Sequence, residues 1–145
     1  MMLQNRVANE VEHPLIIDLW ERSVSQTHSF LTQEDQAFFK EHLPNYLNQV
    51  EVLLWKDGKD IIGFSGVTND NLDMLFLDPN FIGKQYGSHI LNWLVANKGV
   101  TRLDVNEQNE KAKEFYLQHG FVVASRSNTD GFGKNYPILH LVKQD

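Results

Sequence analysis

The N-terminal third of the chain has apolar residues at the three- and four-residue spacing of amphipathic helices. His13-Pro14 places a proline in the first turn of one predicted helix. Its apolar stripe consists of Leu15, Ile16, Leu19, Trp20 and Val24. Residues 25–31 (SQTHSFL) break this period, so we expect a loop that carries His28. Thr32 then resembles a helix cap, and we expect a second helix that ends at Pro44.

From Val50 the apolar residues form short runs separated by turn residues, which is the pattern of strands. Runs 50–56, 61–67 and 72–77 predict an antiparallel meander. The other expected elements are an edge strand at 3–7, a helix from Gly87, a strand at 102–105, a helix from Asn109 to His119, and strands at 121–125 and 138–142 around a polar loop at 127–135. Because a helix connects strands 72–77 and 102–105, they should pair in parallel.

Length and composition narrow the class of protein. A chain of 145 residues can bury a sufficient hydrophobic core without disulfide bonds or a structural metal, and we expect one domain over residues 1–145. With 13 Lys and Arg against 19 Asp and Glu, the net charge is −6, which disfavours nucleic acid and anionic membranes as partners. Cysteine is absent, which excludes disulfides and thiolate chemistry. Without a signal-peptide pattern, a membrane-length apolar span or histidines at ligand spacing, we expect a cytoplasmic protein that binds no metal.

Residues 72–94 read as a strand, a glycine-bearing loop and the first turns of an apolar helix. Asp78, Pro79 and Asn80 are residue types typical of a tight turn, and Gly83 and Gly87 bracket the loop that follows. A helix N-terminus offers free amides, and glycines let backbone approach a phosphate closely. Neither a Walker sequence nor a dinucleotide signature is present. The stretch therefore predicts either a site for the pyrophosphate of another cofactor or an ordinary turn before a helix.

Two segments resemble the motifs of the GNAT family of acetyl-CoA-dependent N-acetyltransferases. LFLDPNFIGKQYGSHIL is similar to the family's acetyl-CoA segment, and VNEQNEKAKEFYLQHGF to its second segment. The matching positions of the second segment are Asn109, Ala112, Phe115, Tyr116, Gly120 and Phe121. SVSQTHSFL and GKNYPILHL further resemble small bacterial members of the family. The resemblance implies an α/β (α+β) fold, in which a central mixed, mostly antiparallel sheet of about seven strands is flanked by about four helices.

The resemblance also implies transfer of an acetyl group from acetyl-CoA to a primary amine, by direct attack in a ternary complex. The amine would belong to a protein lysine or a small molecule, and the enzyme would be a monomer or homodimer. The cofactor-binding residues that it implies are Phe76, Leu77, Ile82, Gly83, Lys84, Gln85, Tyr86, Gly87, Ser88 and Asn109. Two alternatives are a CoA-binding regulatory domain with little or no turnover and an N-acyltransferase that uses another acyl-CoA.

The glycine loop departs from the family pattern at two positions. Ile82 stands where Gln or Arg is expected, and Gln85 where the middle glycine is expected. Losing the polar side chain removes one partner of the pyrophosphate, although Lys84 could supply a charge and backbone amides do most of the binding. We expect Gln85 to avoid a positive φ, which would strain a non-glycine residue.

Three residues are candidates for the chemistry. The resemblance implies that Tyr116 donates a proton to the departing CoA thiolate; a core aromatic is the alternative. Asp73 should share a face with Leu75 and Leu77, and it could deprotonate the incoming ammonium or merely be solvated. His28 is the rival base, with a pKa near neutral, or else an exposed loop residue. Asn109 is a favoured helix cap whether or not it binds cofactor.

Overall fold

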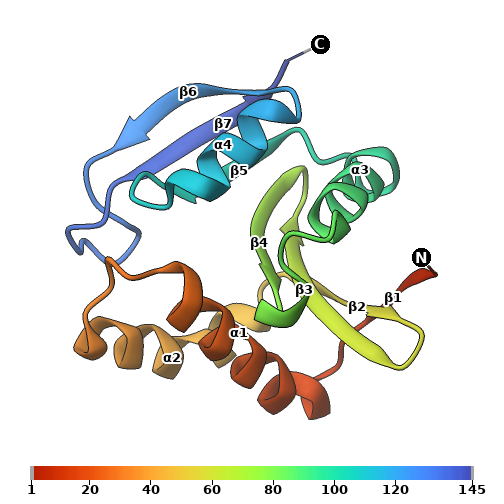
Figure 1. Ribbon diagram of the computed structural model, residues 1–145. Helices are drawn as coiled ribbons and strands as arrows, with labels where there is room; N and C mark the ends of the chain where they lie inside the picture. Colours follow the sequence, from red (N-terminus) through yellow and green to blue (C-terminus); the bar gives the residue numbers. More distant parts are fainter. Residues whose placement is uncertain (1, 145) are drawn as a thin grey trace.

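The computed structural model describes residues 2–144, and Figure 1 shows the arrangement of its elements. Across these residues the elements are β1 (Leu3–Val7), η1 (Glu10–Glu12), α1 (His13–Thr27), α2 (Gln33–Leu47), β2 (Glu51–Asp57), β3 (Asp60–Thr68), β4 (Asn71–Leu77), η2 (Pro79–Phe81), α3 (Tyr86–Lys98), β5 (Arg102–Asn106), α4 (Glu110–Gln118), β6 (Phe121–Ser127) and β7 (Ile138–Lys143). The strands form one sheet in the order β1-β2-β3-β4-β5-β7-β6. Every neighbouring pair is antiparallel except β4 and β5. The predicted fold class and the parallel pairing are confirmed.

Helices cover both faces of the sheet, with α1 and α2 on one face and α3 and α4 on the other (Figure 1). The alternation of side chains along β2 divides its residues between two cores. Val52 and Leu54 pack on the side of α1 and α2, whereas Leu53 and Trp55 pack on the side of α3. Full burial of one such side chain contributes about 1.5 to 3 kcal/mol to folding. The sheet is thereby held rigidly between two helical layers.

The sheet parts between β4 and β5. Only residues 71–72 of β4 pair with residues 102–103 of β5, whereas the ladder between β3 and β4 continues to Leu77. The rest of β4 and β5 therefore diverge at the centre of the sheet, where no strand fills the space between them.

A bulge in β4 lies beside this split. The ladder with β3 passes from Leu72 to Met74, so Asp73 is the extra residue. The bulge places Leu72 in the same core as Leu75 and Leu77. The prediction that Asp73 shares a face with Leu75 and Leu77 is therefore wrong, because simple alternation fails at a bulge.

Two predicted boundaries are also wrong. Helix α1 continues into the stretch expected to be a loop and ends at Thr27. Helix α2 passes through Pro44 and ends at Leu47. The carbonyl of Lys40, which loses its helical donor at Pro44, lies on an exposed residue where water can donate instead. Burial of Leu43 and Leu47 holds the final turn in place.

Candidate active site

A cleft of about 1020 Å³ occupies the space where β4 and β5 diverge. The end of α1, β4, the start of α3, β5 and α4 all contribute to its lining. The predicted site residues that line it are His28, Asp73, Phe76, Leu77, Ile82, Gly83, Gln85, Gly87, Ser88, Asn109 and Tyr116. The side chains of Lys84 and Tyr86 do not. One cleft therefore brings together nearly all the residues that the sequence singled out.

One end of the cleft presents a row of free backbone amides. Among residues 2–144, no acceptor takes a hydrogen bond from the N–H groups of residues 83–88. They precede the first amide that bonds along α3, that of His89, which donates to the Gln85 carbonyl at 3.3 Å. The positive end of the helix dipole adds to them. Free amides at the start of a helix suit an anion without any side-chain cation.

Gln85 joins this loop to α3 with a left-handed backbone, with φ +71°. The prediction that it avoids a positive φ is wrong. The chain is extended at Ile82 and helical from Tyr86, and a left-handed residue makes the turn between them. Left-handed and right-handed residues in succession point their amides into one concavity, which suits an anion. The strain at a non-glycine residue costs on the order of 1 to 2 kcal/mol.

The other side chains of residues 82–88 add little charge to the cleft. The Lys84 ammonium lies over the Phe81 ring, 5.6 Å from its centroid. The Tyr86 hydroxyl donates to the Asp57 carboxylate at 2.5 Å, away from the cleft. Ile82 lines the cleft with an apolar side chain that is 45% exposed. Any contribution of Lys84 and Tyr86 to anion binding therefore comes from their amides.

Tyr116 projects from α4 into the cleft. The side chain is buried, yet within residues 2–144 its hydroxyl has no hydrogen-bonding partner. No fully buried polar atom of the described side chains lacks a partner, so this hydroxyl reaches the surface of the cleft. Burial raises the pKa of Tyr116, which keeps the phenol protonated at neutral pH. Asn109 fixes the start of α4 as predicted, because its side chain accepts the Ala112 amide at 3.3 Å.

His28 ends α1 and is buried rather than exposed. Its Nδ1 lies 2.7 Å from the Thr27 hydroxyl, and its ring packs against Phe30 and Phe76. Burial lowers the pKa of His28 to about 4. The expected near-neutral pKa is therefore wrong, and the imidazole is uncharged at neutral pH. Its Nε2 has no partner among residues 2–144.

Asp73 lies among polar groups at the point where β4 and β5 part. Its carboxylate accepts hydrogen bonds from Thr68 at 2.6 Å and from Asn71 at 2.7 Å. The Asn71 amide also approaches the Asp104 carboxylate at 3.4 Å, and Asp104 lines the cleft. Tyr46 of α2 lies near Asp73, and burial together with this carboxylate raises the pKa of Tyr46. Two carboxylates therefore give this part of the cleft a negative charge.

Sequence reasoning missed Asp104, although the signal was available. Asp104 stands between Leu103 and Val105, both buried, in a predicted strand. Alternation turns its side chain to the face opposite those two, and parallel pairing brings its strand beside Asp73. His140 of β7 lies behind it, with Nδ1 2.7 Å from the Asp104 carboxylate.

The loop between β6 and β7 reaches across to α2, and Figure 1 shows it beside the α1–α2 connection. We call residues 128–137 the strap. Lys134 donates to Asp35 at 2.8 Å, and the Tyr136 hydroxyl donates to the same carboxylate. The Lys134 ammonium holds the pKa of Asp35 below its usual range. Phe132 packs edge-on against Phe38, 5.0 Å between ring centroids. The strap thereby covers the side of the molecule next to His28 and Phe30.

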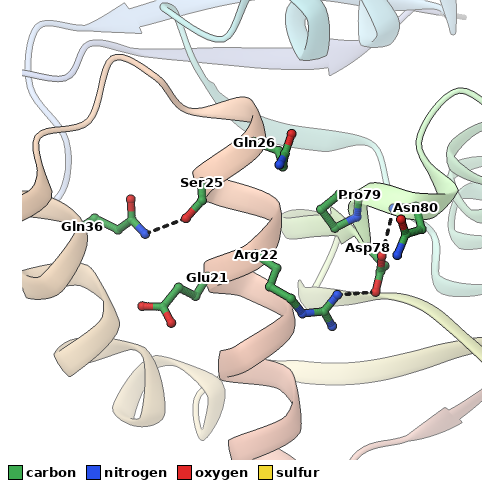
Figure 2. A pocket seen from close by; sticks show the side chains of 8 residues that line it. All are labelled: Glu21, Arg22, Ser25, Gln26, Gln36, Asp78, Pro79 and Asn80. Atoms are coloured by element: carbon green, nitrogen blue, oxygen red, sulfur yellow. Dashed lines mark hydrogen bonds and ion pairs between the residues drawn. The ribbon is translucent and has the colours of Figure 1, made fainter.

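A second hollow of about 530 Å³ adjoins the cleft on the outer side of α1, and Figure 2 shows its lining. The Arg22 guanidinium donates to the buried Asp78 carboxylate at 2.5 Å, and this pair holds the pKa of Arg22 above its usual value. Asp78 also accepts the Asn80 amide at 2.9 Å. These bonds tie α1 to the end of β4 and fix one wall of the cleft.

Two further findings concern the described residues as a whole. Between residues 2 and 144, no helix combines the length and apolarity that crossing a membrane requires. In the same residues, no three His, Asp or Glu side chains gather as metal ligands would.

The order of the elements, and the divergence of β4 and β5 next to the free amides of residues 83–88, match the acetyltransferase fold that the sequence predicts. Comparison with known proteins gives the same class. The Acetyltransferase (GNAT) domain family matches residues 48–123. The peptidyl-lysine N-acetyltransferase YjaB of Salmonella typhimurium is 34% identical over 98% of this chain and 99% of its own. The YjaB of Escherichia coli is 31% identical over 97% of each chain. The chain belongs to the GNAT family of acetyltransferases.

Solved structures give the same result for the fold. The solution structure of apo-form YjaB from Escherichia coli superposes with a TM-score of 0.89, at 30% identity over 99% of this chain and 98% of that one. The PaiA N-acetyltransferase of Thermoplasma acidophilum, in complex with coenzyme A, gives 0.72 at 23% identity, covering 99% and 100%. The predicted resemblance to the family is confirmed. The protein is an N-acetyltransferase that takes its acetyl group from acetyl-CoA and passes it to an amine.

Proposed function

We propose that the acceptor is the side-chain amine of lysine in a protein, and that the protein works in the cytoplasm, where acetyl-CoA and protein acceptors meet. The observation that carries the proposal is the pair of carboxylates, Asp73 and Asp104, in the cleft that also holds the free amides of residues 83–88. An ammonium group is drawn to the carboxylates and a pyrophosphate to the amides. The names of the two YjaB relatives, at 34% and 31% identity, support lysine over other amines.

The amides of residues 83–88 would hold the pyrophosphate of acetyl-CoA, with Gly83 and Gly87 allowing close approach. The edge of β4 at Phe76 and Leu77 has no strand partner on the β5 side, and it would pair with the pantetheine amides as an added strand does. Asn109 shapes the opposite wall by capping α4. Acetyl-CoA supplies the thioester, and these residues orient it.

The transfer proceeds by direct attack of the lysine nitrogen on the thioester carbonyl carbon. A new C–N bond forms, the C–S bond breaks, and the electron pair of that bond goes to sulfur. Tyr116 gives its phenolic proton to the sulfur, and solvent returns a proton to the phenolate. The phenol suits this role because it is protonated, has no partner among residues 2–144, and lines the cleft.

The attacking amine must first lose a proton, because an ammonium has no lone pair. Asp73 would accept that proton, directly or through water. His28 is the weaker candidate for this step, since burial lowers its pKa to about 4. Its free Nε2 can instead accept a hydrogen bond from the incoming nitrogen and help to aim it.

A comparison of acceptors tests the proposal. A lysine-containing peptide, the same peptide with arginine in place of lysine, and spermidine are each offered with acetyl-CoA, and release of CoA thiol is followed together with the mass of the products. We expect the highest kcat/KM with the lysine peptide and none with the arginine peptide. A higher kcat/KM with spermidine would show that the acceptor is a small polyamine.

A further inference from the structure

Ser88 and His119 join α3 and α4, the two helices that border the free amides of residues 83–88. Ser88 lies in the first turn of α3 and lines the cleft, and its hydroxyl is 2.9 Å from His119 Nε2. His119 caps the C-terminus of α4, and its Nδ1 is 2.7 Å from the Phe115 carbonyl oxygen. The ring is thus anchored to α4 through Nδ1 and contacts Ser88 of the amide-bearing loop through Nε2.

These contacts fix which nitrogen carries a proton. A carbonyl oxygen can only accept, so Nδ1 of His119 must be the donor to Phe115. In the neutral imidazole, Nε2 is then an acceptor, and it takes the single hydroxyl proton of Ser88. The Ser88 oxygen has only lone pairs left for the cleft, and lone pairs repel the oxygens of a phosphate.

Protonation of His119 reverses this direction. In the imidazolium both nitrogens donate, so Nε2–H donates to the Ser88 oxygen. The hydroxyl proton of Ser88 is then released to point into the cleft, where a phosphate oxygen can accept it. The same proton places a positive charge behind the free amides of residues 83–88.

We propose that His119 is a proton-linked positioning residue for the pyrophosphate of CoA: binding takes up a proton on His119, which turns the Ser88 hydroxyl toward the ligand. The inference rests on the proposed placement of the pyrophosphate at residues 83–88. Other side chains do not fill this role, because Ile82 is apolar and the Lys84 ammonium lies over Phe81. Lys111 also lines the cleft, but eight residues of helix, about 12 Å, separate it from His119.

The surroundings of the ring set the conditions for proton uptake. The Lys143 ammonium of β7 lies beside Gly120, the residue after His119, 3.4 Å from the position of a Cβ there. The other titratable groups on α3 and α4 form no hydrogen bond with the ring: Tyr86, His89, Lys98, Glu110, Lys111, Lys113, Glu114 and Tyr116. The negative charge of the bound phosphates favours the imidazolium form of a nearby histidine.

Calorimetry tests the inference without any turnover. Dephospho-CoA is titrated into the protein in two buffers of different ionisation enthalpy, because its pyrophosphate does not titrate near neutral pH. The difference in binding heat then counts protons taken up by the protein. We expect an uptake approaching one proton for the wild type and none for His119→Gln, which lacks the titrating ring. Ser88→Ala should also weaken binding by about tenfold.

His89→Gln is the matched control, since His89 is an exposed histidine next to Ser88 whose ring contacts neither Ser88 nor His119 through a hydrogen bond. It should leave the proton uptake unchanged. Zero uptake in the wild type, or equal uptake in His119→Gln, would overturn the inference. Amide NMR shifts of residues 83–88 on adding dephospho-CoA report separately on the placement of the pyrophosphate, so the two failures are distinguishable.

Discussion

Tyr116→Phe separates catalysis from packing because it deletes one hydroxyl and keeps the ring. That hydroxyl has no partner among residues 2–144, so its loss should change the free energy of unfolding by less than about 1 kcal/mol. General acid catalysis contributes about 10² to 10⁴-fold, and the lower figure suits a thiolate, which is a good leaving group. We therefore expect kcat to fall about 100-fold, which corresponds to about 2.7 kcal/mol of barrier.

The assay is release of CoA thiol at saturating acetyl-CoA and lysine peptide. The melting temperature and the affinity for CoA are measured on the same preparation. Tyr136→Phe gives a contrast, because its hydroxyl donates to Asp35 and its loss should affect the strap rather than proton donation to sulfur. A folded Tyr116→Phe enzyme with wild-type kcat would refute the reasoning and leave solvent as the proton donor.

Three further predictions follow from the geometry. Asp73→Asn should lower kcat/KM for a lysine peptide at least about tenfold without changing CoA affinity. Asp70, a nearby carboxylate, is paired with Arg102 outside the cleft, so Asp70→Asn should keep turnover. Equal losses in both variants would argue against a role for Asp73. His28 has a pKa of about 4 in the folded protein and about 6.5 in the unfolded chain. Between these two pH values the unfolded chain binds a proton that the folded protein does not bind. The free energy of unfolding therefore has its full value above pH 6.5 and decreases as the pH falls from there toward 4. At pH 5 the loss in free energy of unfolding relative to pH 7 is about 2 kcal/mol. His28→Gln should therefore show a smaller fall in melting temperature than the wild type between pH 7 and pH 5. Gln85→Gly should relieve the left-handed backbone and stabilise the fold by up to about 1 kcal/mol, more than Asn69→Gly, since asparagine tolerates that conformation; a lower melting temperature for Gln85→Gly would contradict this.

Local patterns were sufficient to predict most of the fold. The change of period near Val50, the turns at Asp57-Gly58 and Asn69-Asp70, and the cap at Asn109 each depend on neighbouring residues, and the structure has all of them. The parallel pairing of β4 and β5 followed from the handedness of the connection between them. These features can be predicted because the physics that fixes them acts within a few residues.

The remaining features depend on distant parts of the chain. The bulge at Asp73 arises from pairing with β3, and the pKa of His28 is lowered by side chains that pack over it. The passage of α2 through Pro44 depends on burial of Leu43 and Leu47 in a core shared with the sheet. The bond between Ser88 and His119 joins residues 31 positions apart. No local pattern contains such information, and for this reason the chemistry of the site was less predictable than its outline.

The strap has a consequence for the order in which the enzyme forms. Its bonds from Lys134 and Tyr136 to Asp35 join residues that are 99 and 101 positions apart. Contacts of such long range form late, because the entropy of closing a large loop must be overcome first. During synthesis, Asp35 leaves the ribosome long before Tyr136 does. A nascent chain can therefore fold α1, α2 and the meander, while the side of the molecule next to His28 and Phe30 acquires its cover only when the last hairpin docks.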